Sequence, residues 1–137
     1  MSIITNVFGR EIIDSRGVPT VEVEITLNNS IVELASVPSG ASTGSFEAYE
    51  LRDEDKKRFF SKGVLNSVNF INTEIRETIK GIDVREQKTI DNILIELDGT
   101  NNKSRLGANS MLAVSLATAR AAAKFLNVPL FSYIGGI

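Results

Sequence analysis

The chain has 137 residues, of which 42% are hydrophobic and 23% charged, so it can form one compact domain with its own core. Its 15 basic and 17 acidic residues give a net charge of -2, which argues against a nucleic-acid binder. It has no cysteine and no histidine, which excludes disulfides, thiolate catalysis and the commonest transition-metal ligands and leaves hard, oxygen-bound cations such as Mg²⁺.

Hydropathy predicts neither a membrane span nor a secretory signal. The amino terminus is polar and alternating, unlike the charged start and apolar run of a signal peptide. The longest apolar-rich stretch, residues 111–126, is too polar to span a membrane. We therefore expect a cytoplasmic protein. The polar interruptions in that stretch are Ser115, Thr118, Arg120 and Lys124.

Residues 20–27 predict a half-buried β-strand. Apolar and polar residues alternate strictly here, which places the two kinds on opposite faces of a sheet. The polar face carries Glu22, Glu24 and Thr26, and the apolar face carries Val21, Val23, Ile25 and Leu27.

Two flanking segments predict strands that pair with this one. Turn residues at 28–30 precede a second apolar run at 31–37, as in a β-hairpin. Residues 3–13 are also rich in strand-forming residues, and turn residues at 14–17 connect them to the first strand. Gly9 marks either a bulge or a close approach of another segment. The expected sheet has three antiparallel strands.

Helical periods replace this alternation in the second half of the chain. Residues 62–80 carry an apolar stripe that ends at Gly81. Asp83 and Glu86 predict a capping box for a second helix, and the alanine-rich residues 109–126 predict a third. The fold class is therefore α+β, with a three-stranded antiparallel sheet followed by a helical bundle packed on one face. The stripe consists of Val64, Val68, Ile71, Ile75 and Ile79.

Residues 38–46 read PSGASTGSF and follow a predicted strand directly, as phosphate-binding loops do. Gly40 and Gly44 enclose three residues and Ser45 follows, whereas a Walker A loop has four residues between its glycines and then lysine. The dinucleotide-binding pattern also fails, because no G-x-G precedes a helix. Two hypotheses remain. The local pattern favours an ordinary surface loop, and the alternative is a glycine-hinged lid that reaches a metal or an anion when it closes.

Three other candidates for chemistry are weaker. Lys103 and Arg105 precede a helix start that could bind an anion, but a plain helix entry capped by Asn109 or a nearby hydroxyl is the commoner arrangement. The carboxylates of the predicted strand could do acid–base chemistry, yet on an exposed face they usually serve solubility. The mixed-charge run 52–58 predicts a solvated surface segment. No residues assemble a nucleophile, a base and an orienting group, as a complete enzyme would need.

Three segments, taken together and in order, carry a specific resemblance. They read GREIIDSRGVPTVEVE at 9–24, VPSGASTG at 37–44 with EA at 47–48 and ELRD at 50–53, and LDGTNNKSRLGAN at 97–109. These segments resemble the amino-terminal domain of the enolase family, and the likeness runs from Ile3 to Gly136. One position departs, because Val18 stands where the family usually has Asn in a turn.

The resemblance implies the function of a larger protein. Enolases dehydrate 2-phosphoglycerate to phosphoenolpyruvate in glycolysis with two Mg²⁺ ions, so Mg is the expected cofactor. Residues 1–137 would form the amino-terminal capping domain. A (β/α) barrel that supplies the lysine base, the glutamate acid and the ligands of the tighter metal is absent from this chain. The isolated chain is therefore expected to be inactive, and the complete enzyme to be a homo-oligomer, a dimer or higher.

The resemblance also implies roles for residues of this chain. Ser42 would give its hydroxyl and backbone oxygens to the second Mg²⁺, on a loop that closes over the substrate. Arg10, Arg16 and Glu22 are implied contacts with the partner's barrel across a dimer interface. The lid loop comprises Ser39, Gly40, Ala41, Ser42, Thr43 and Gly44.

Functions of two other classes remain as alternatives. A standalone binding module would use the glycine loop for a phosphate or a metal, which titration with Mg²⁺ and phosphorylated ligands would reveal. An interaction domain would assemble through the strand face that carries Glu22 and Glu24, which light scattering would reveal.

Overall fold

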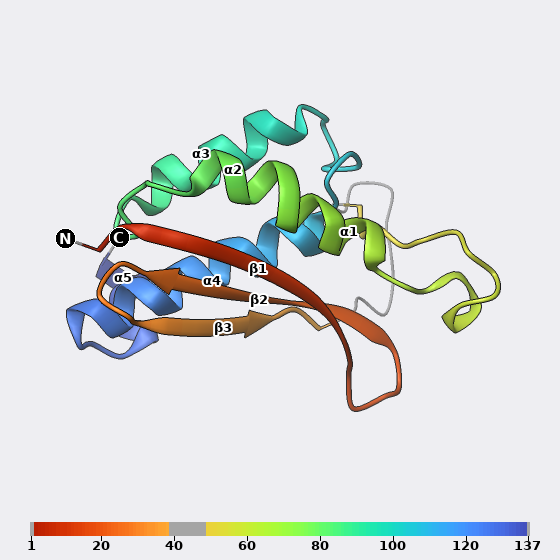
Figure 1. Cartoon of the computed structure of the whole chain (residues 1–137), viewed down its shortest axis with the longest axis horizontal. Coiled ribbons are helices and arrows are strands. Elements are labelled where there is room, and N and C mark those ends of the chain that lie inside the picture. Colours follow the sequence, from red (N-terminus) through yellow and green to blue (C-terminus); the bar gives the residue numbers. More distant parts are fainter. Residues whose placement is uncertain (1, 39–48, 137) are drawn as a thin grey trace.

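A computed structural model describes residues 2–38 and 49–136, in which three strands form one antiparallel sheet in the order β1-β2-β3 (Figure 1). β1 spans Ile4–Ile13, β2 spans Pro19–Leu27 and β3 spans Val32–Ser36. The register pairs Val7 with Ile25 and Val23 with Ala35. The predicted three-stranded antiparallel sheet is confirmed.

The two faces of the sheet differ as the alternation in β2 predicts. Val21, Val23 and Ile25 are fully buried against the helices. The carboxylates of Glu22 and Glu24 lie on the opposite face and are partly exposed. The sheet therefore has one face in the core and one open face.

The β1–β2 turn is held by Asp14, whose carboxylate accepts hydrogen bonds from the backbone N–H groups of Arg16 (2.8 Å) and Val18 (2.9 Å). Gly17 adopts a φ of 79°, which favours glycine. These contacts use only the backbone of Val18, so a change of side chain at this position leaves them intact.

Gly9 marks a close approach rather than a bulge. A Cβ atom there would lie 2.8 Å from Cγ2 of Ile71, which is fully buried. The irregularity in the β1–β2 register lies elsewhere, between Ile4 and Asn6. Glycine at position 9 therefore lets the helix that carries Ile71 lie directly on β1.

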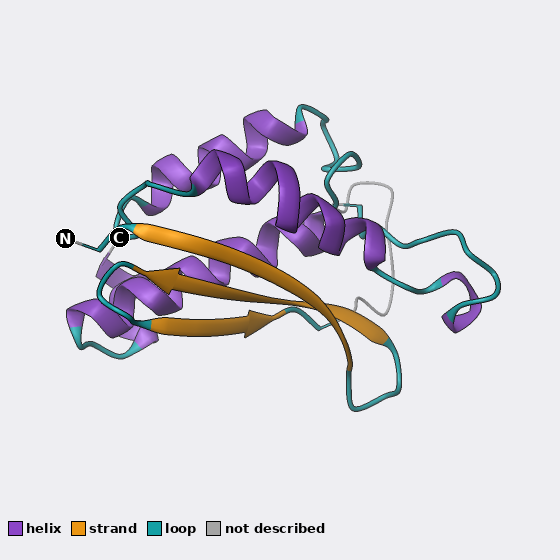
Figure 2. Ribbon diagram, viewed as in Figure 1, coloured by secondary structure: helices purple, strands orange, loops and turns teal. Residues whose placement is uncertain are grey.

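The helical elements lie on one side of the sheet, as expected (Figure 2). Helix α4 packs on β2 and β3, while α1, η2 and α2 pack on β1. Helix α3 packs on α4 and α2, and α5 packs on α4. Their bounds are η1 Phe59–Ser61, α1 Leu65–Phe70, η2 Ile71–Ile75, α2 Arg76–Ile79, α3 Gln87–Asp98, α4 Ala108–Leu126 and α5 Leu130–Gly136.

The elements α1, η2 and α2 follow one another without a break, which confirms the helix predicted over 62–80. Its middle turn, η2, is π-helical and therefore wider than an α-helical turn. Ser67 rather than Val68 is fully buried in the first part. Gly81 ends the helix with a φ of 94°, as predicted.

The capping box predicted for α3 is wrong. The helix begins after Glu86, whose side chain makes no capping hydrogen bond. The carboxylate of Asp83 instead accepts hydrogen bonds from the Ser2 hydroxyl (2.8 Å) and the Arg85 backbone N–H (2.9 Å). Asp83 therefore links the amino terminus to a local turn.

Helix α4 confirms the predicted alanine-rich helix and ends at Asn127, which has a left-handed φ of 57°. Helix α5, which follows Pro129, has no counterpart among the elements predicted from the sequence. Proline favours the first turn of a new helix. In the described part of the chain no single helix is long and apolar enough to span a membrane, although α4 and α5 together, bent by 101°, meet the criteria of length and composition.

Candidate functional site

The predicted lid, Ser39 to Gly44, lies outside the described residues, so the structure shows only the residues on either side of it. The description stops after β3, at Val37 and Pro38, here called the outgoing end, and resumes at Tyr49, here called the returning end. The candidate site is therefore built from the residues that hold these two ends.

The outgoing end is fixed to β2. The Thr20 hydroxyl, which is buried, donates a hydrogen bond to the carbonyl of Val37. The backbone N–H of Val37 donates to the carbonyl of Val21 at 3.3 Å. The backbone bond extends the β2–β3 pairing one residue beyond the end of β3, and the two bonds together fix the position of Val37.

The returning end is fixed to the start of α4. The Tyr49 N–H donates to the Asn102 carbonyl, and the Ala108 N–H donates to the Tyr49 carbonyl, both at 2.7 Å. The side-chain amide of Asn109 then binds both backbone groups of Leu51, accepting from its N–H and donating to its carbonyl, each at 3.1 Å. Residues 49–51 thus run beside the loop before α4 and the start of that helix, and hydrogen bonds hold them there.

Arg52 holds the next part of the chain to the sheet. Its guanidinium donates hydrogen bonds to the carbonyls of Pro19 and of Lys62 (2.7 Å), and it pairs with the carboxylate of Glu50. Arg52 therefore connects the start of β2 with both ends of the segment 52–62.

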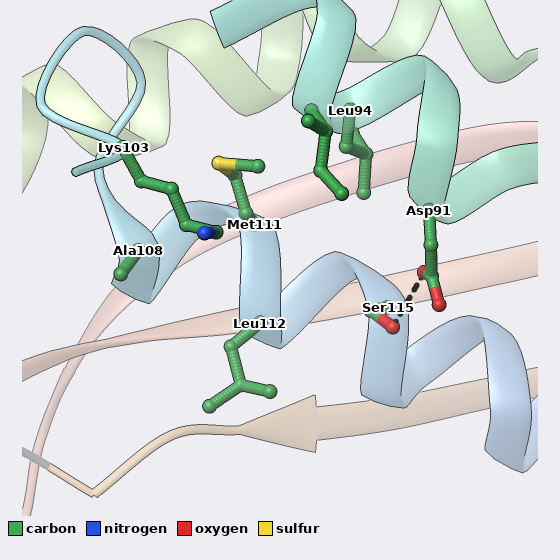
Figure 3. A pocket seen from close by; sticks show the side chains of 8 residues that line it. Asp91, Leu94, Lys103, Ala108, Met111, Leu112 and Ser115 are labelled. Atoms are coloured by element: carbon green, nitrogen blue, oxygen red, sulfur yellow. Dashed lines mark hydrogen bonds between the residues drawn. The ribbon is translucent and has the colours of Figure 1, made fainter. Parts of the chain in front are cut away.

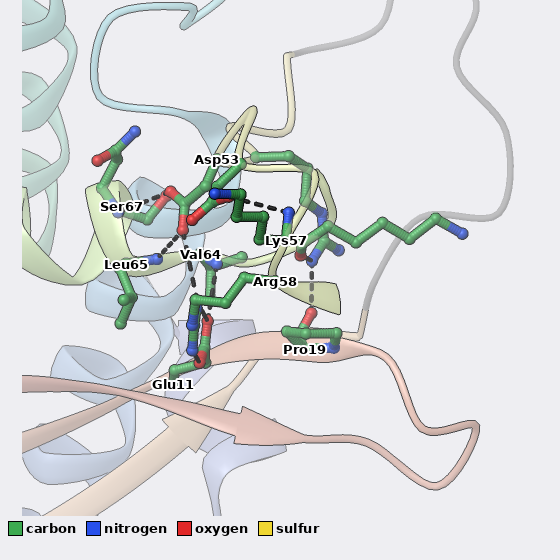
Figure 4. Close-up of polar contacts among 12 residues, drawn as sticks. Glu11, Pro19, Asp53, Lys57, Arg58, Val64, Leu65 and Ser67 are labelled. Carbon is green, nitrogen blue, oxygen red and sulfur yellow. Dashed lines mark hydrogen bonds and ion pairs between the residues drawn. The ribbon is translucent and has the colours of Figure 1, made fainter. Parts of the chain in front are cut away.

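Arg58 and two carboxylates connect the segment 52–62 to β1 and to the start of α1 (Figure 4). Arg58 pairs with Glu11, and its distance to the carboxylate of Asp53 is 3.8 Å. Asp53 in turn accepts from the N–H groups of Leu65 (2.7 Å) and Asn66 (2.9 Å), which are free donors at the start of α1. The segment 52–58, predicted to be merely solvated, is thus tied to β1 and α1.

The pKa of Glu11 reflects this pairing. Burial alone would raise the pKa, but the hydrogen bonds from Arg58 and from the Val64 N–H, together with the charge of Arg58, lower it below the ordinary value. The pKa of Arg58 is correspondingly raised by its hydrogen bond to Glu11. Glu11 is therefore held ionised, as a structural partner rather than a proton donor.

Asp98 organises the loop that leads to Asn109. Its side chain, which is buried, accepts hydrogen bonds from the N–H groups of Thr100 (2.9 Å) and Leu106 (2.7 Å) and from the Thr100 hydroxyl. Burial would raise the pKa of Asp98, but these hydrogen bonds outweigh it and lower the pKa below the usual range.

The structure brings two of the three predicted dimer-contact residues together. Arg10 on β1 and Glu22 on β2 are cross-strand neighbours on the open face, and their side chains form an ion pair at 2.7 Å. Arg10 also lies 3.6 Å from Glu24 and over the ring of Phe8. Arg16 is not part of this group, because it lies in the β1–β2 turn beside Asp14.

The helix entry at 102–109 is structural, as the sequence favours, although its cap differs. Arg105 donates to the Leu97 carbonyl at 2.6 Å and pairs with Glu74 at 3.1 Å, so this cation serves packing. The N-cap of α4 is Gly107, with no side-chain cap. Asn109 does not cap the helix, because its amide binds Leu51.

A groove of about 350 Å³ between α3 and α4 is mainly apolar (Figure 3). Leu94, Met111 and Leu112 line it, and its polar pair, Ser115 and Asp91, is joined by a hydrogen bond of 2.7 Å. Within residues 2–38 and 49–136, no three acidic side chains lie close enough together to hold a metal.

Sequence reasoning missed Thr20, Arg52 and Asn109 as the residues that hold the ends of the 39–48 segment. Each acts on a backbone group far along the chain, 58 residues away in the case of Asn109. The motif quoted at 97–109 contains Asn109, but only the fold shows what its side chain binds.

Comparison with known proteins identifies the family of this chain. Residues 4–134 match the family model described as "Enolase, N-terminal domain". The chain is 58% identical over 134 residues to "Enolase" of Ehrlichia ruminantium strain Gardel, and equally to "Enolase" of strain Welgevonden. The aligned residues cover 98% of this chain and 32% of each relative, so the chain spans about a third of the length of the curated relatives that it matches.

Replacing the Asp98 carboxylate should destabilise the domain in a pH-dependent way. Because the folded-state pKa is lowered, the ionised group stabilises the fold above the unfolded-state pKa of about 3.9 and this contribution is lost as pH falls through the folded-state pKa. We expect Asp98→Asn to lower the free energy of unfolding by about 1–3 kcal/mol at pH 7. In denaturant titrations the difference in the free energy of unfolding between the parent chain and Asp98→Asn should narrow below about pH 3.9.

A matched control is Glu96→Gln, which removes an exposed carboxylate from the same helix and should cost less than about 0.5 kcal/mol. A difference between the parent chain and Asp98→Asn that stays constant down to pH 2.5, well below the model-peptide pKa of about 3.9, would contradict the role of the ionised carboxylate.

Proposed function

Because the chain belongs to the enolase family, we propose that it is the amino-terminal capping domain of a cytoplasmic enzyme that dehydrates 2-phosphoglycerate to phosphoenolpyruvate in glycolysis. The observation that carries this proposal is the 58% identity over 98% of the chain to relatives named "Enolase". Those relatives are about three times as long, which leaves room for a catalytic barrel that follows these residues.

The chemistry of such a reaction supports placing its catalytic groups on a domain other than this one. Removing the proton next to a carboxylate needs a general base, expelling the hydroxyl needs a general acid, and the developing negative charge needs cations. The described carboxylates that are buried deepest, Asp53 and Asp98, instead accept hydrogen bonds from backbone amides. We therefore assign the base and the acid to the barrel, outside this chain.

We assign to this chain the loop that covers the substrate. Ser39 to Gly44 would close over the bound substrate, and the hydroxyl and carbonyl oxygens of Ser42 would serve as ligands of the second Mg²⁺. Neutral oxygens suit this ion, and bound Mg²⁺ would supply positive charge opposite the charge that develops on the substrate. The fixed ends of the segment, at Val37 and Leu51, support the assignment, since a loop that must close in one place needs stable ends.

We also assign to the open face of the sheet a contact with another subunit, in a homodimer or a larger homo-oligomer. Arg10 and Glu22 offer a preformed pair of opposite charges on that face, and Arg16 lies at the exposed β1–β2 turn near its end. The groups of a partner's barrel that bind them would need complementary charge.

The isolated chain should not turn over substrate. We expect this chain with 2-phosphoglycerate and Mg²⁺ to show no rise in the ultraviolet absorbance of phosphoenolpyruvate, because the base, the acid and most metal ligands are assigned to the barrel. The complete enzyme at the same concentration is the positive control. Measurable turnover by the isolated chain would mean that it carries a catalytic centre of its own.

In the complete enzyme, Ser42→Ala should weaken the second metal site. We expect the Mg²⁺ concentration for half-maximal rate to rise by about tenfold or more and turnover to fall, with an unchanged thermal midpoint, because one oxygen ligand is lost. Ser45→Ala removes a nearby hydroxyl that the proposal leaves without a role, and it should have no such effect. An unchanged Mg²⁺ dependence in Ser42→Ala would exclude the metal-ligand role.

In the complete enzyme, exchanging the charges of Arg10 and Glu22 should weaken the subunit contact, while the ion pair between β1 and β2 can still form with its charges reversed. We expect the double variant Arg10→Glu/Glu22→Arg to raise the dimer dissociation constant by about tenfold or more in sedimentation experiments at low salt. The control exchanges Lys124 and Glu33, a pair 4.0 Å apart between α4 and β3. Equal dissociation constants for both double variants would show that the open face is not the contact.

A further inference from the structure

The groove between α3 and α4 has the size and the lining of a small-molecule site (Figure 3). Its volume is about 350 Å³, and its apolar lining includes Leu94, Ile95, Met111 and Leu112. Ile95 and Leu112 remain 50% and 56% exposed, although both carry large apolar side chains. An apolar body seated in the groove would remove these side chains from water, which stabilises a complex.

Lys103 lies at one end of this groove. Its side chain is partly buried and runs from the loop before α4 toward Met111 (Figure 3). Among the described residues, no hydrogen bond or ion pair joins its ammonium group. Arg105, the other cation of this loop, binds the Leu97 carbonyl and Glu74. Lys103 therefore keeps an unpaired positive charge beside apolar atoms, where an anion is attracted more strongly than in water.

The backbone at Lys103 is also unusual. Its φ of 61° lies in the left-handed region, which residues other than glycine rarely adopt. The Lys103 carbonyl accepts a hydrogen bond of 3.0 Å from the Gly107 N–H, which holds the loop in this conformation. Backbone positions of this kind are concentrated at ligand sites, and here the position belongs to the residue that carries the unpaired charge.

The opposite end of the groove carries a carboxylate that already has partners (Figure 3). Asp91 accepts hydrogen bonds from the Ser115 hydroxyl (2.7 Å) and from the side-chain amide of Gln87 (3.0 Å). A second anionic group placed at this end would be repelled by Asp91. The groove therefore favours a ligand with one anionic group, at Lys103, and an uncharged far end.

The length of the groove limits the ligand further. Ala108 and Ser115 both line it, and they are separated by about 10 Å along the axis of α4 at a rise of 1.5 Å per residue. An extended chain of about eight carbon atoms has this length. The substrate 2-phosphoglycerate has two anionic groups and no apolar body, so it does not have the chemistry that this groove selects.

We propose that the α3–α4 groove binds a small monocarboxylate with an apolar chain, such as a fatty acid of medium length. The carboxylate pairs with Lys103, and the chain lies on Leu94, Met111 and Leu112. Charge complementarity selects this occupant, because the groove offers one unpaired cation above an apolar floor. The proposal concerns a ligand of this chain and does not depend on the reaction proposed above.

The test measures binding of octanoate to this chain and to the complete enzyme, by calorimetry and by methyl chemical shifts. We expect saturable binding with a dissociation constant of about 1 mM or tighter, as about ten non-hydrogen atoms commonly give. The methyl groups of Leu94, Met111 and Leu112 should shift. Acetate lacks the chain, octan-1-ol lacks the charge and octanedioate adds a second carboxylate, so each should bind about fivefold more weakly or worse.

Variants of Lys103 test the charge. Lys103→Gln keeps a long polar side chain, and it should weaken octanoate binding by about tenfold, the usual effect of one charge-assisted pair, without changing octan-1-ol binding. Lys103→Arg keeps the charge and should keep the affinity. Lys88→Gln is the matched control, because Lys88 is an exposed lysine of α3 that does not line the groove. Thermal midpoints without ligand show whether each variant is folded.

Three results would overturn the proposal. Equal octanoate affinity in Lys103→Gln and Lys88→Gln would show that the Lys103 side chain only covers apolar surface. Absence of saturable binding to this chain would show that the groove takes no such ligand. Binding to this chain but not to the complete enzyme would show that another part of the polypeptide occupies the groove.

Discussion

The close packing of α4 on the sheet is the constraint on which the rest of this domain depends. Nearly half of the helix is alanine or serine, and small side chains let a helix approach β2 and β3 closely. The same helix packs on α3 and α5, so it connects two strands of the sheet with two of the other helices. A shift of α4 would therefore move the core and the start of the helix, where Asn109 lies, together.

Several acidic side chains in the described part of the chain bind structural groups. Asp53 accepts from two N–H groups at the start of α1, and Asp98 accepts from the loop before α4. Glu11 is held ionised by Arg58. A general acid must bind a proton near neutral pH, whereas the lowered pKa values of Glu11 and Asp98 keep them ionised. Their ionised carboxylates are therefore structural partners of Arg58 and of the loop before α4.

The sequence predicts the sheet well because its signals are local. The alternation in β2 decides which side chains are buried, and Asp14 with Gly17 decides the β1–β2 turn. The prediction failed where a residue has a distant partner. Asp83 matches a capping-box pattern, but its carboxylate binds the Ser2 hydroxyl 81 residues away. Ser67 rather than Val68 is buried in α1, where its hydroxyl donates a hydrogen bond to the carbonyl of the distant Leu51.

The candidate site was less predictable for the same reason. The glycine-rich segment was visible as a motif, whereas the side chains that hold its ends lie on other elements and give no periodic signal. The fold makes these distant contacts interdependent: Thr20 holds the outgoing end to β2, Asn109 holds the returning end to α4, and β2 packs against α4. Because the two anchors share one core, the separation of the two ends is set by packing rather than by the segment itself. Any chain that joins these two ends therefore starts and finishes at positions that the core fixes, which is what the proposed function requires of them.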